Sequence, residues 1–193
     1  MDLKLKNKTV FVSGSSKGIG FETAKLFLEE GATVIINGRT DKSVQNALKK
    51  LNTPKVSGIA ADFIEDKQID ELIKKLPDID ILVNNAIFPD QQRPFFETDE
   101  IYWDRMMNLS LKGYFFASQR AAKEMISGGT GGRIICLSSV HSYVAMPNWT
   151  AYGTAKMALR RMVKGIAADL AGKNITANCI APGAISNKLP DIE

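Results

Sequence analysis

The sequence predicts an α/β fold: a doubly wound parallel sheet in three layers, with helices on both faces. Short apolar runs rich in β-branched residues alternate with longer segments whose apolar residues recur at helical spacing. Strands that alternate with helices form parallel sheets, and helices on both faces explain why these strands are apolar throughout. At 193 residues the chain fits one domain, residues 1–193, because no linker, repeat or low-complexity tract divides it.

Six strands and five helices are expected, in strict alternation for most of the chain. The strands are the apolar runs 9–13, 33–36, 56–60, 79–83, 133–137 and 175–181. The helices are 18–30, 41–51, 66–76, 99–126 and 150–171. Gly31 is the expected stop of the first helix, and Asp41 is the expected N-cap of the second.

Composition narrows the classes of function. The net charge of +4 comes from scattered lysines and arginines, so no basic stripe predicts nucleic-acid binding. Cys136 and Cys179 lie in apolar runs and are expected to be buried, reduced thiols, with no spacing typical of a metal site. The N-terminus lacks the apolar core of a signal peptide, and no apolar run reaches the ~18–20 residues of a membrane span. We therefore expect a cytoplasmic protein without metal or membrane contacts.

A glycine-rich turn follows the first expected strand and opens the first helix. Glycines let the main chain approach a pyrophosphate, and the helix N-terminus offers unpaired N–H groups and a favourable dipole. A purely structural turn is the alternative, but the position between strand and helix favours a dinucleotide site. The residues expected to bind the cofactor here are Gly14, Ser16, Lys17, Gly18, Ile19 and Gly20.

The end of the second strand indicates which dinucleotide binds. Proteins that bind NAD usually carry an acid there for the ribose hydroxyls, and this chain has Gly38 at that position. Arg39 follows, and together with Lys17 it could bind a 2′-phosphate through charge-assisted hydrogen bonds. NADP(H) is therefore favoured over NAD(H). Asp41 as a substitute acid, or Arg39 as an ordinary surface residue, are the alternatives.

Tyr152 and Lys156 stand one helical turn apart and project from the same face. An ammonium beside a phenol favours the phenolate, so Lys156 is expected to lower the pKa of Tyr152 from its usual value near ~10. Such a phenol can exchange a proton with an alcohol or ketone. A lone Tyr-x-x-x-Lys is weak evidence and gains its weight from the glycine-rich turn.

With the glycine turn, Asn84-Asn85-Ala86, Asn108, Ser139, Tyr152 and Lys156 in this order, the chain resembles the short-chain dehydrogenases/reductases over essentially all of its length. The resemblance implies a Rossmann-like domain in which Tyr152 is the general acid/base. Lys156 would lower the pKa of Tyr152 and hold the nicotinamide ribose, while Ser139 would hydrogen-bond the substrate oxygen. Asn108 would bend its helix and support a proton relay through water.

The same resemblance implies further cofactor and substrate contacts. Asp62 would bind the adenine, and Asn84 to Ala86 would line the adenosine side. Pro182 and Gly183 would border the nicotinamide, with Ile185 also in the cofactor site. The residues expected to line the substrate pocket are His141, Tyr143 and Trp149.

These observations predict an oxidoreductase that transfers a hydride between NADP(H) and a small-molecule carbonyl or secondary alcohol. A carbonyl reduction needs a proton donor and a group that stabilises the developing oxyanion, and the tyrosine and serine hydroxyls supply both. The alternative is a non-catalytic nucleotide-binding regulatory or oligomerisation subunit. Family resemblance implies a homodimer or homotetramer through the helices 99–126 and 150–171.

Three positions and the end of the chain depart from the family pattern. Ser13 replaces the usual threonine before the glycine turn, a minor change because the hydroxyl is kept. Ile87 replaces a glycine, and because a β-branched residue tolerates positive φ poorly, the loop is expected to run differently there. Asn187 replaces a threonine that is common in the family. The Asn187 amide could still hydrogen-bond the nicotinamide carboxamide. The chain also lacks the expected lid and last strand, which leaves the sixth strand as an apolar edge. We expect a C-terminally truncated chain; the alternative is a short form whose edge a partner or a rearrangement covers.

Overall fold

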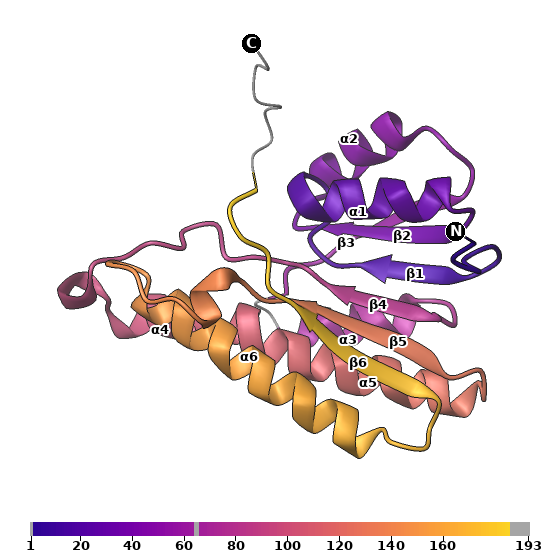
Figure 1. Cartoon of the computed structure of the whole chain (residues 1–193). Coiled ribbons are helices and arrows are strands. Elements are labelled where there is room, and N and C mark those ends of the chain that lie inside the picture. The colour runs from indigo at the N-terminus through magenta and orange to yellow at the C-terminus, as the bar shows by residue number, and fades with distance from the viewer. Residues whose placement is uncertain (1, 64–65, 186–193) are drawn as a thin grey trace, which may run out of the picture.

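The computed structural model describes residues 2–63 and 66–185. Its sheet has six parallel strands in the order β3-β2-β1-β4-β5-β6. The strands are β1 (Thr9–Val12), β2 (Thr33–Gly38), β3 (Val56–Ala60), β4 (Ile81–Asn84), β5 (Gly132–Leu137) and β6 (Ile175–Ile180). The predicted doubly wound parallel sheet is confirmed (Figure 1).

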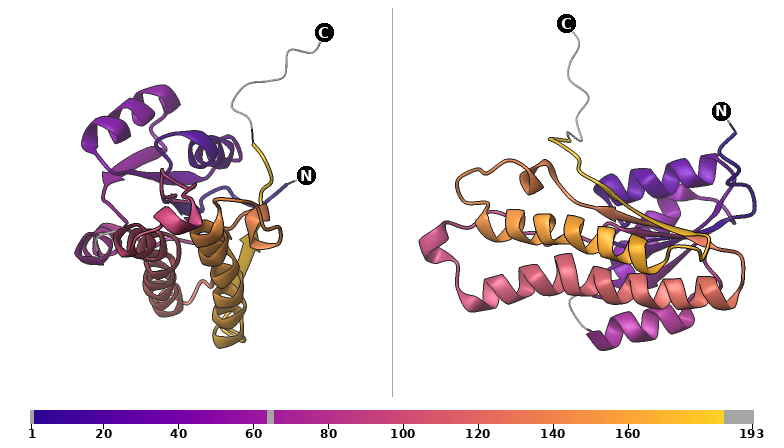
Figure 2. Two further views of the ribbon diagram at one scale, coloured as in Figure 1. Left: turned by 90° about the vertical axis from the view of Figure 1, so that its left-hand side faces the viewer. Right: turned by 60° about the horizontal axis from the view of Figure 1, so that its bottom comes forward.

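Helices cover both faces of this sheet. One face carries α1 (Gly18–Glu29) and α2 (Asp41–Leu51), and the other carries α3 (Asp66–Lys75), α5 (Tyr114–Ser127) and α6 (Thr150–Asp169) (Figures 1 and 2). The short helix α4 (Glu100–Met107) precedes α5, and single 3₁₀ turns occur at Phe95–Glu97 and Val140–Ser142. The carboxyl ends of all six strands therefore meet at one edge, where α/β proteins bind their ligands.

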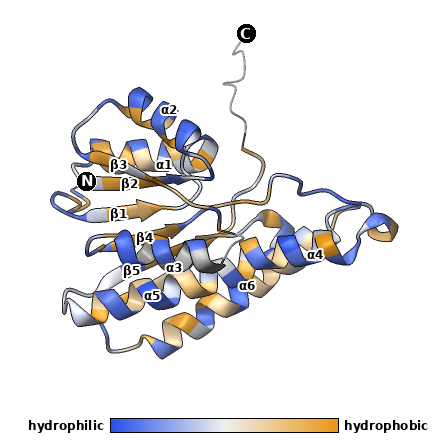
Figure 3. Cartoon of the chain, turned by 180° about the vertical axis from the view of Figure 1, so that it is seen from behind, coloured by the Kyte–Doolittle hydropathy of each residue, from blue (hydrophilic) through white to orange (hydrophobic). Residues whose placement is uncertain are grey.

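The core consists of two apolar clusters, one on each face of the sheet. Strand β1 shows the division, because Val10 and Val12 belong to one cluster while Phe11 between them belongs to the other. The apolar colouring of the strands contrasts with the mixed faces of the helices in Figure 3. Burial on both faces explains why the strands read as continuous apolar runs.

The helix predicted over 99–126 is not continuous. Asp99 caps α4 by accepting a hydrogen bond from the Tyr102 N–H at 2.7 Å, and a π-helical segment, Asn108–Gly113, separates α4 from α5. Apolar spacing did not reveal the break, because an inserted π turn shifts the helix face without stopping it. Asn108 opens this segment, at the place where the family resemblance implied a bend.

Two expectations about helix ends have different outcomes. Gly31 follows α1 with φ of +89°, so its role as a stop is confirmed. Asp41 is not the N-cap of α2: Thr40 is, and its hydroxyl accepts a hydrogen bond from the Ser43 N–H at 3.2 Å. Asp41 is instead the first residue of α2, where its charge complements the helix dipole.

Strand limits differ from the predictions by up to two residues. Strand β2 continues beyond Ile36 to Gly38, and β4 begins at Ile81 where residue 79 was expected. Strand β6 is an edge of the sheet in the described part of the chain. Both cysteines are free, Cys136 buried and Cys179 half-buried, with burial raising the pKa of the Cys136 thiol to about 12.

Candidate active site

The glycine turn after β1 packs directly against the chain that follows β4. A Cβ added at Gly14 would lie 2.6 Å from the Ala86 Cα, and Gly14 has φ of +61°. A Cβ at Gly20 would collide with the Asn85 amide. Both positions therefore require glycine for close backbone approach, as the sequence predicts for a phosphate-binding turn.

Hydrogen bonds from buried side chains hold this turn. The Ser13 hydroxyl accepts from the backbone N–H groups of Asn85 at 2.9 Å and Ala86 at 3.0 Å. The Asn37 side-chain oxygen accepts from the Gly14 N–H at 3.0 Å, and its amide donates to Ile59 and Ala61 carbonyls. Asn37 thus joins the turn to β2 and β3. Sequence reasoning missed it, although a polar residue inside an apolar strand is a usable sign of such a role.

The start of α1 is open for an anion. Lys17 is the N-cap residue but makes no side-chain cap, and a Cβ at Gly18 would meet no atom within 4 Å. The N–H groups of the first turn, at Gly18, Ile19 and Gly20, have no carbonyl partner within the helix. Ser16 is half-buried, while Lys17 and Ile19 are exposed. The cradle thus fits a dinucleotide pyrophosphate, with donors and positive dipole facing outward.

The end of β2 has no room for an acid in its present packing. A Cβ at Gly38 would lie 2.6 Å from the Ser43 Oγ and 3.0 Å from the Ser16 Cβ. Arg39, the next residue, is exposed, as is Lys17 in the glycine turn. Position 38 thus carries no carboxylate, and the exposed Arg39 follows it directly.

The other expected cofactor residues lie along the same edge. Asp62 is half-buried after β3, and its N–H donates to the Gln68 side chain at 2.8 Å. Pro182 follows β6 and accepts from the Val140 N–H at 2.8 Å, beside an unobstructed Gly183 and an exposed Ile185. Asn187 lies outside the described residues.

The end of β4 and the segment after it carry the residues expected to line the adenosine side. Asn84, the last residue of β4, is fully buried, and its amide donates to the Ser118 hydroxyl at 3.0 Å. Its place beside the adenosine stays a prediction. Ala86 is buried, and its carbonyl accepts from the Tyr114 hydroxyl at 2.7 Å. Ile87 is exposed and is absent from the residues with positive φ, so the loop avoids the conformation that a glycine would allow.

Ser139, Tyr152 and Lys156 come together where β5 ends and α6 begins. They are 7%, 4% and 1% exposed. The Lys156 ammonium donates to the Leu137 carbonyl at 2.8 Å, and the Ser138 hydroxyl donates to the Lys156 carbonyl at 2.9 Å. These two bonds fix the buried face of α6 to the end of β5. Tyr152 and Lys156, which lie on that face, are therefore held in a fixed relative position.

The electrostatics of this pair differ from the prediction. Burial raises the pKa of Tyr152, and hydrogen bonding by Ser139 opposes that rise; Lys156 is not among the causes. The Lys156 ammonium lies 5.6 Å from the Tyr152 ring centroid and is directed to a backbone carbonyl. Burial lowers the pKa of Lys156 to about 8. Tyr152 therefore holds its proton at neutral pH, whereas Lys156 is mostly charged.

Tyr114 borders the pair, and Asn108 lies in a segment that contacts α6. The Tyr114 ring lies 5.3 Å from the Lys156 ammonium, and this tyrosine is fully buried, which raises its pKa well above the usual value. Tyr114 was not predicted, because only the fold brings α5 under α6. Asn108 is half-buried in the π segment, which packs against α6.

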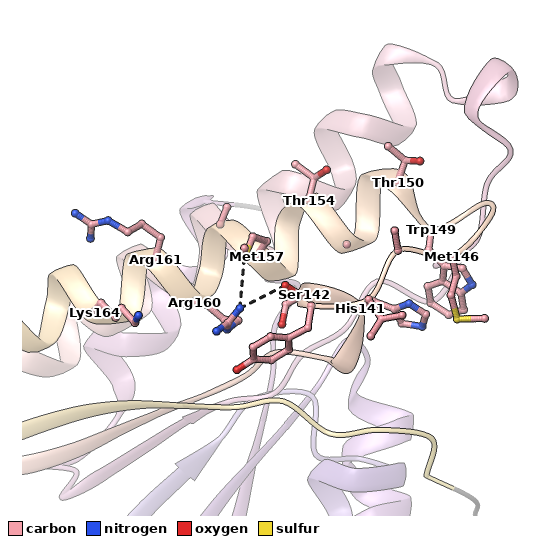
Figure 4. A pocket seen from close by; sticks show the side chains of 15 residues that line it. His141, Ser142, Met146, Trp149, Thr150, Thr154, Met157, Arg160, Arg161 and Lys164 are labelled. Carbon is pink, nitrogen blue, oxygen red and sulfur yellow. Dashed lines mark hydrogen bonds between the residues drawn. The ribbon is translucent and has the colours of Figure 1, made fainter.

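The expected substrate residues His141, Tyr143 and Trp149 all line one hollow of about 790 Å³ beside α6. The His141 ring stacks on Trp149, with centroids 4.0 Å apart (Figure 4). Both rings meet the Tyr152 ring edge-on, at 5.9 and 5.3 Å. Ser139 and Tyr152 do not line the hollow. The stacked pair therefore contacts the hollow and the candidate proton donor alike.

Residues 2–63 and 66–185 contain neither a metal-binding cluster nor a membrane-spanning helix. No group of three or more His, Cys, Asp or Glu side chains could hold a metal ion there. None of the helices in that part is long and apolar enough to cross a membrane.

The sequence matches a known protein family over nearly its whole length. The family profile described as short chain dehydrogenase matches residues 8–190. The chain belongs to the short-chain dehydrogenase family. Its members are oxidoreductases that act on alcohols and carbonyls and bind nicotinamide dinucleotides.

Individual members of the short-chain dehydrogenase family agree with this assignment. A short-chain type dehydrogenase/reductase of Picea abies is 33% identical, over 96% of this chain and 73% of that protein. An NAD-dependent glycerol dehydrogenase of Listeria innocua is 31% identical, over 97% and 74%. The crystal structure of a gluconate 5-dehydrogenase from Burkholderia cenocepacia in complex with NADP and tartrate is 33% identical, with a TM-score of 0.84, over 93% and 72%. The chain thus spans about three quarters of the length of these relatives.

Proposed function

We propose that this chain transfers a hydride between NADP(H) and a carbonyl or secondary alcohol, with Tyr152 as general acid/base. One observation carries the proposal: Ser139, Tyr152 and Lys156 converge, buried, at the sheet edge that also holds the open glycine turn. The non-catalytic alternative is not favoured, since a subunit without chemistry has no need to bury a lysine at the cost that its lowered pKa reflects.

Each of the clustered side chains has its own role in the reduction of a carbonyl. A bound nicotinamide dinucleotide would supply the hydride in the reduction and accept it in the reverse reaction. The Ser139 hydroxyl hydrogen-bonds the carbonyl oxygen, and the Tyr152 hydroxyl gives its proton to that oxygen as negative charge develops. Because burial raises the pKa of Tyr152, this proton is present at neutral pH. The Lys156 ammonium would hold the nicotinamide ribose, and Asn108 would support the reprotonation of Tyr152 through water.

Replacing Tyr152 tests the reaction. We expect Tyr152→Phe to lower the turnover of NADPH with a reducible ketone by roughly 10²–10⁴-fold, because the proton donor is lost. NADPH affinity should remain, since Tyr152 is only 4% exposed and is not part of the glycine turn. Tyr102→Phe is the matched control, because its hydroxyl bonds the Asp90 carbonyl instead. Equal turnover in both variants would refute the role of Tyr152, and absence of nucleotide binding in the unaltered chain would refute the whole proposal.

NADP(H) is proposed over NAD(H), although relatives that use either are known. The choice is supported by the packed Gly38, which carries no acid, and by the exposed cations Arg39 and Lys17. We expect Arg39→Ala to weaken NADPH about tenfold or more while NADH changes little, because one charge-assisted contact with the 2′-phosphate is lost. Titration of both nucleotides by calorimetry measures this, and equal losses would contradict the assignment.

A homodimer or homotetramer through α4, α5 and α6 is also proposed. Large apolar side chains on these helices support it, since Trp103, Phe115 and Ile126 are each 39–43% exposed. Sedimentation equilibrium of the chain and of a Phe115→Glu variant tests it, with dissociation expected in the variant.

A further inference from the structure

Tyr114 is a fully buried tyrosine to which the proposed reaction gives no role. It is the first residue of α5 and follows directly on the π segment Asn108–Gly113. The extra residue of a π turn rotates the side chains after it relative to those before it, so the direction of Tyr114 depends on this segment. A buried tyrosine hydroxyl usually has a hydrogen-bond partner, and the partner of Tyr114 indicates what the residue does.

The hydroxyl of Tyr114 bonds the segment that follows β4. It donates to the Ala86 carbonyl at 2.7 Å. One turn further along α5, the Ser118 hydroxyl accepts from the Asn84 amide at 3.0 Å. Residues four apart share one face of a helix, so this face of α5 holds the end of β4 and the segment after it at two points. Burial raises the pKa of Tyr114 well above its usual value, so the hydroxyl keeps the proton that it donates.

The other side of Ala86 lies against the glycine turn. The Ala86 N–H donates to the Ser13 hydroxyl at 3.0 Å, and a Cβ added at Gly14 would lie 2.6 Å from the Ala86 Cα. Ala86 is therefore held between the turn and α5, with its N–H bonded to one and its carbonyl to the other. Because the packing at Gly14 leaves no free space, a shift of Ala86 must also shift the turn.

We propose that Tyr114 is a positioning residue for the nucleotide: through Ala86, its hydroxyl holds the glycine turn in the form that receives the pyrophosphate. The inference rests on the proposed nucleotide binding and adds a residue on which that binding depends. Without the hydroxyl, the buried Ala86 carbonyl would lose its donor, and the segment would move toward another partner or admit water. The main-chain N–H groups of the turn would then no longer be pre-arranged for an anion.

The ring of Tyr114 makes a separate contact, with Lys156. Its centroid lies 5.3 Å from the Lys156 ammonium, within the range of cation–π interactions. A phenylalanine would keep this ring and most of the side-chain volume and would lose only the hydroxyl. Tyr114→Phe therefore separates the bond to Ala86 from the contact with Lys156.

Nucleotide titration of Tyr114→Phe tests the proposal. We expect the affinities for NADPH and NADH to fall by the same factor, about fivefold or more, because both nucleotides contain the pyrophosphate. Turnover at saturating nucleotide should stay within about twofold, since the ring beside Lys156 remains, so KM rises while kcat is kept. Calorimetry measures the affinities, and oxidation of NADPH with a reducible ketone measures kcat.

Tyr102→Phe is the matched control. Tyr102 is also buried, and its hydroxyl donates to the Asp90 carbonyl at 3.2 Å, further along the same segment after β4. Both variants therefore lose a bond from a buried tyrosine to a backbone carbonyl, and denaturant unfolding should show a loss of stability in both. Only Tyr114→Phe should lose nucleotide affinity, because Ala86 and not Asp90 packs on Gly14.

A double-mutant cycle tests whether the effect passes through Ala86. Ser13→Ala removes the acceptor on the turn side of Ala86 and should also weaken both nucleotides. In Ser13→Ala/Tyr114→Phe the loss of affinity should be smaller than the product of the two single losses, because both bonds hold the same residue.

The role of Tyr114 is refuted if the unaltered chain binds nucleotide and Tyr114→Phe binds it as tightly. It is equally refuted if Tyr102→Phe loses as much affinity, if kcat alone falls, or if the losses in the double variant multiply. Binding of neither nucleotide by the unaltered chain would refute the proposed function itself, and this inference with it.

Discussion

The glycine turn after β1 and the cluster at the start of α6 lie on the same sheet edge but are built from different materials. The turn is a backbone site: Gly14 and Gly20 leave no room for a side chain, and the start of α1 has no side-chain cap. The cluster is a side-chain site, in which Ser139, Tyr152 and Lys156 are buried and oriented by packing. One site therefore depends on the absence of atoms and the other on their presence.

This difference predicts opposite sensitivities to substitution. Adding a methyl group should damage the turn, because the neighbouring backbone cannot retreat. In the cluster, removing a single polar group should abolish its chemistry while leaving the fold, because the remaining side-chain volume still fills the core. The three predictions that follow test this contrast, from the largest expected effect on stability to the smallest.

Gly14→Ala should destabilise the chain by about 3 kcal/mol, since its Cβ meets the Ala86 Cα and left-handed backbone is strained for alanine. Gly18→Ala is the matched control. Its φ of +60° carries the same strain, but its Cβ would have no neighbour within 4 Å. A loss of only about 1 kcal/mol is expected there. Denaturant unfolding measures both, and equal losses would contradict the close approach at Gly14.

Lys156 should make stability depend on pH with a defined sign. Burial lowers its pKa from 10.5 to about 8, so between these values the unfolded chain binds more protons than the folded one. Stability relative to a Lys156→Met variant should therefore rise with pH, by about 1.4 kcal/mol from pH 7 to pH 9. The difference between the two proteins is the quantity to measure, because the raised pKa of Cys136 acts in the opposite direction at higher pH. A difference independent of pH would show that the lysine is solvated.

The smallest expected difference in stability is between variants at the N-caps of α2 and α1. Thr40→Ala should cost about 1 kcal/mol, because the hydroxyl that accepts from the Ser43 N–H is lost. Lys17→Ala at the start of α1 should leave stability nearly unchanged, since that side chain makes no cap. Lys17→Ala should instead weaken NADPH. Thermal unfolding of both variants separates a structural helix start from one kept open for a ligand.

Much of the fold could be predicted from local patterns. The limits of α2 and β3 match the expected ranges, because apolar spacing and flanking turn residues mark both ends. The π segment at Asn108–Gly113 could not be found, since it leaves the apolar pattern nearly unbroken. The cap of α2 was misplaced by one residue because Thr40 and Asp41 are both good capping residues and only backbone geometry distinguishes them.

The candidate site was predictable in its members and less so in their orientation. Ser139, Tyr152 and Lys156 converge as spacing and resemblance indicated. The direction in which the pKa of Tyr152 shifts was predicted wrongly. Helical spacing shows neither the burial of Tyr152 nor that the Lys156 ammonium donates to the Leu137 carbonyl. The buried bond from the Asn84 amide to the Ser118 hydroxyl could not be predicted either, because it joins β4 to α5.

The sequence alone therefore determined the order of strands and helices, and it indicated the glycine turn and the Ser139 and Tyr152 hydroxyls as candidate site groups. These depend on local conformation and residue chemistry, which neighbouring positions specify. Only the tertiary structure decided that Asn37 holds the glycine turn and that Tyr114 lies under Lys156 and bonds Ala86. Such contacts join segments distant along the chain, and burial, which sets charge energetics, exists only once those segments are packed together.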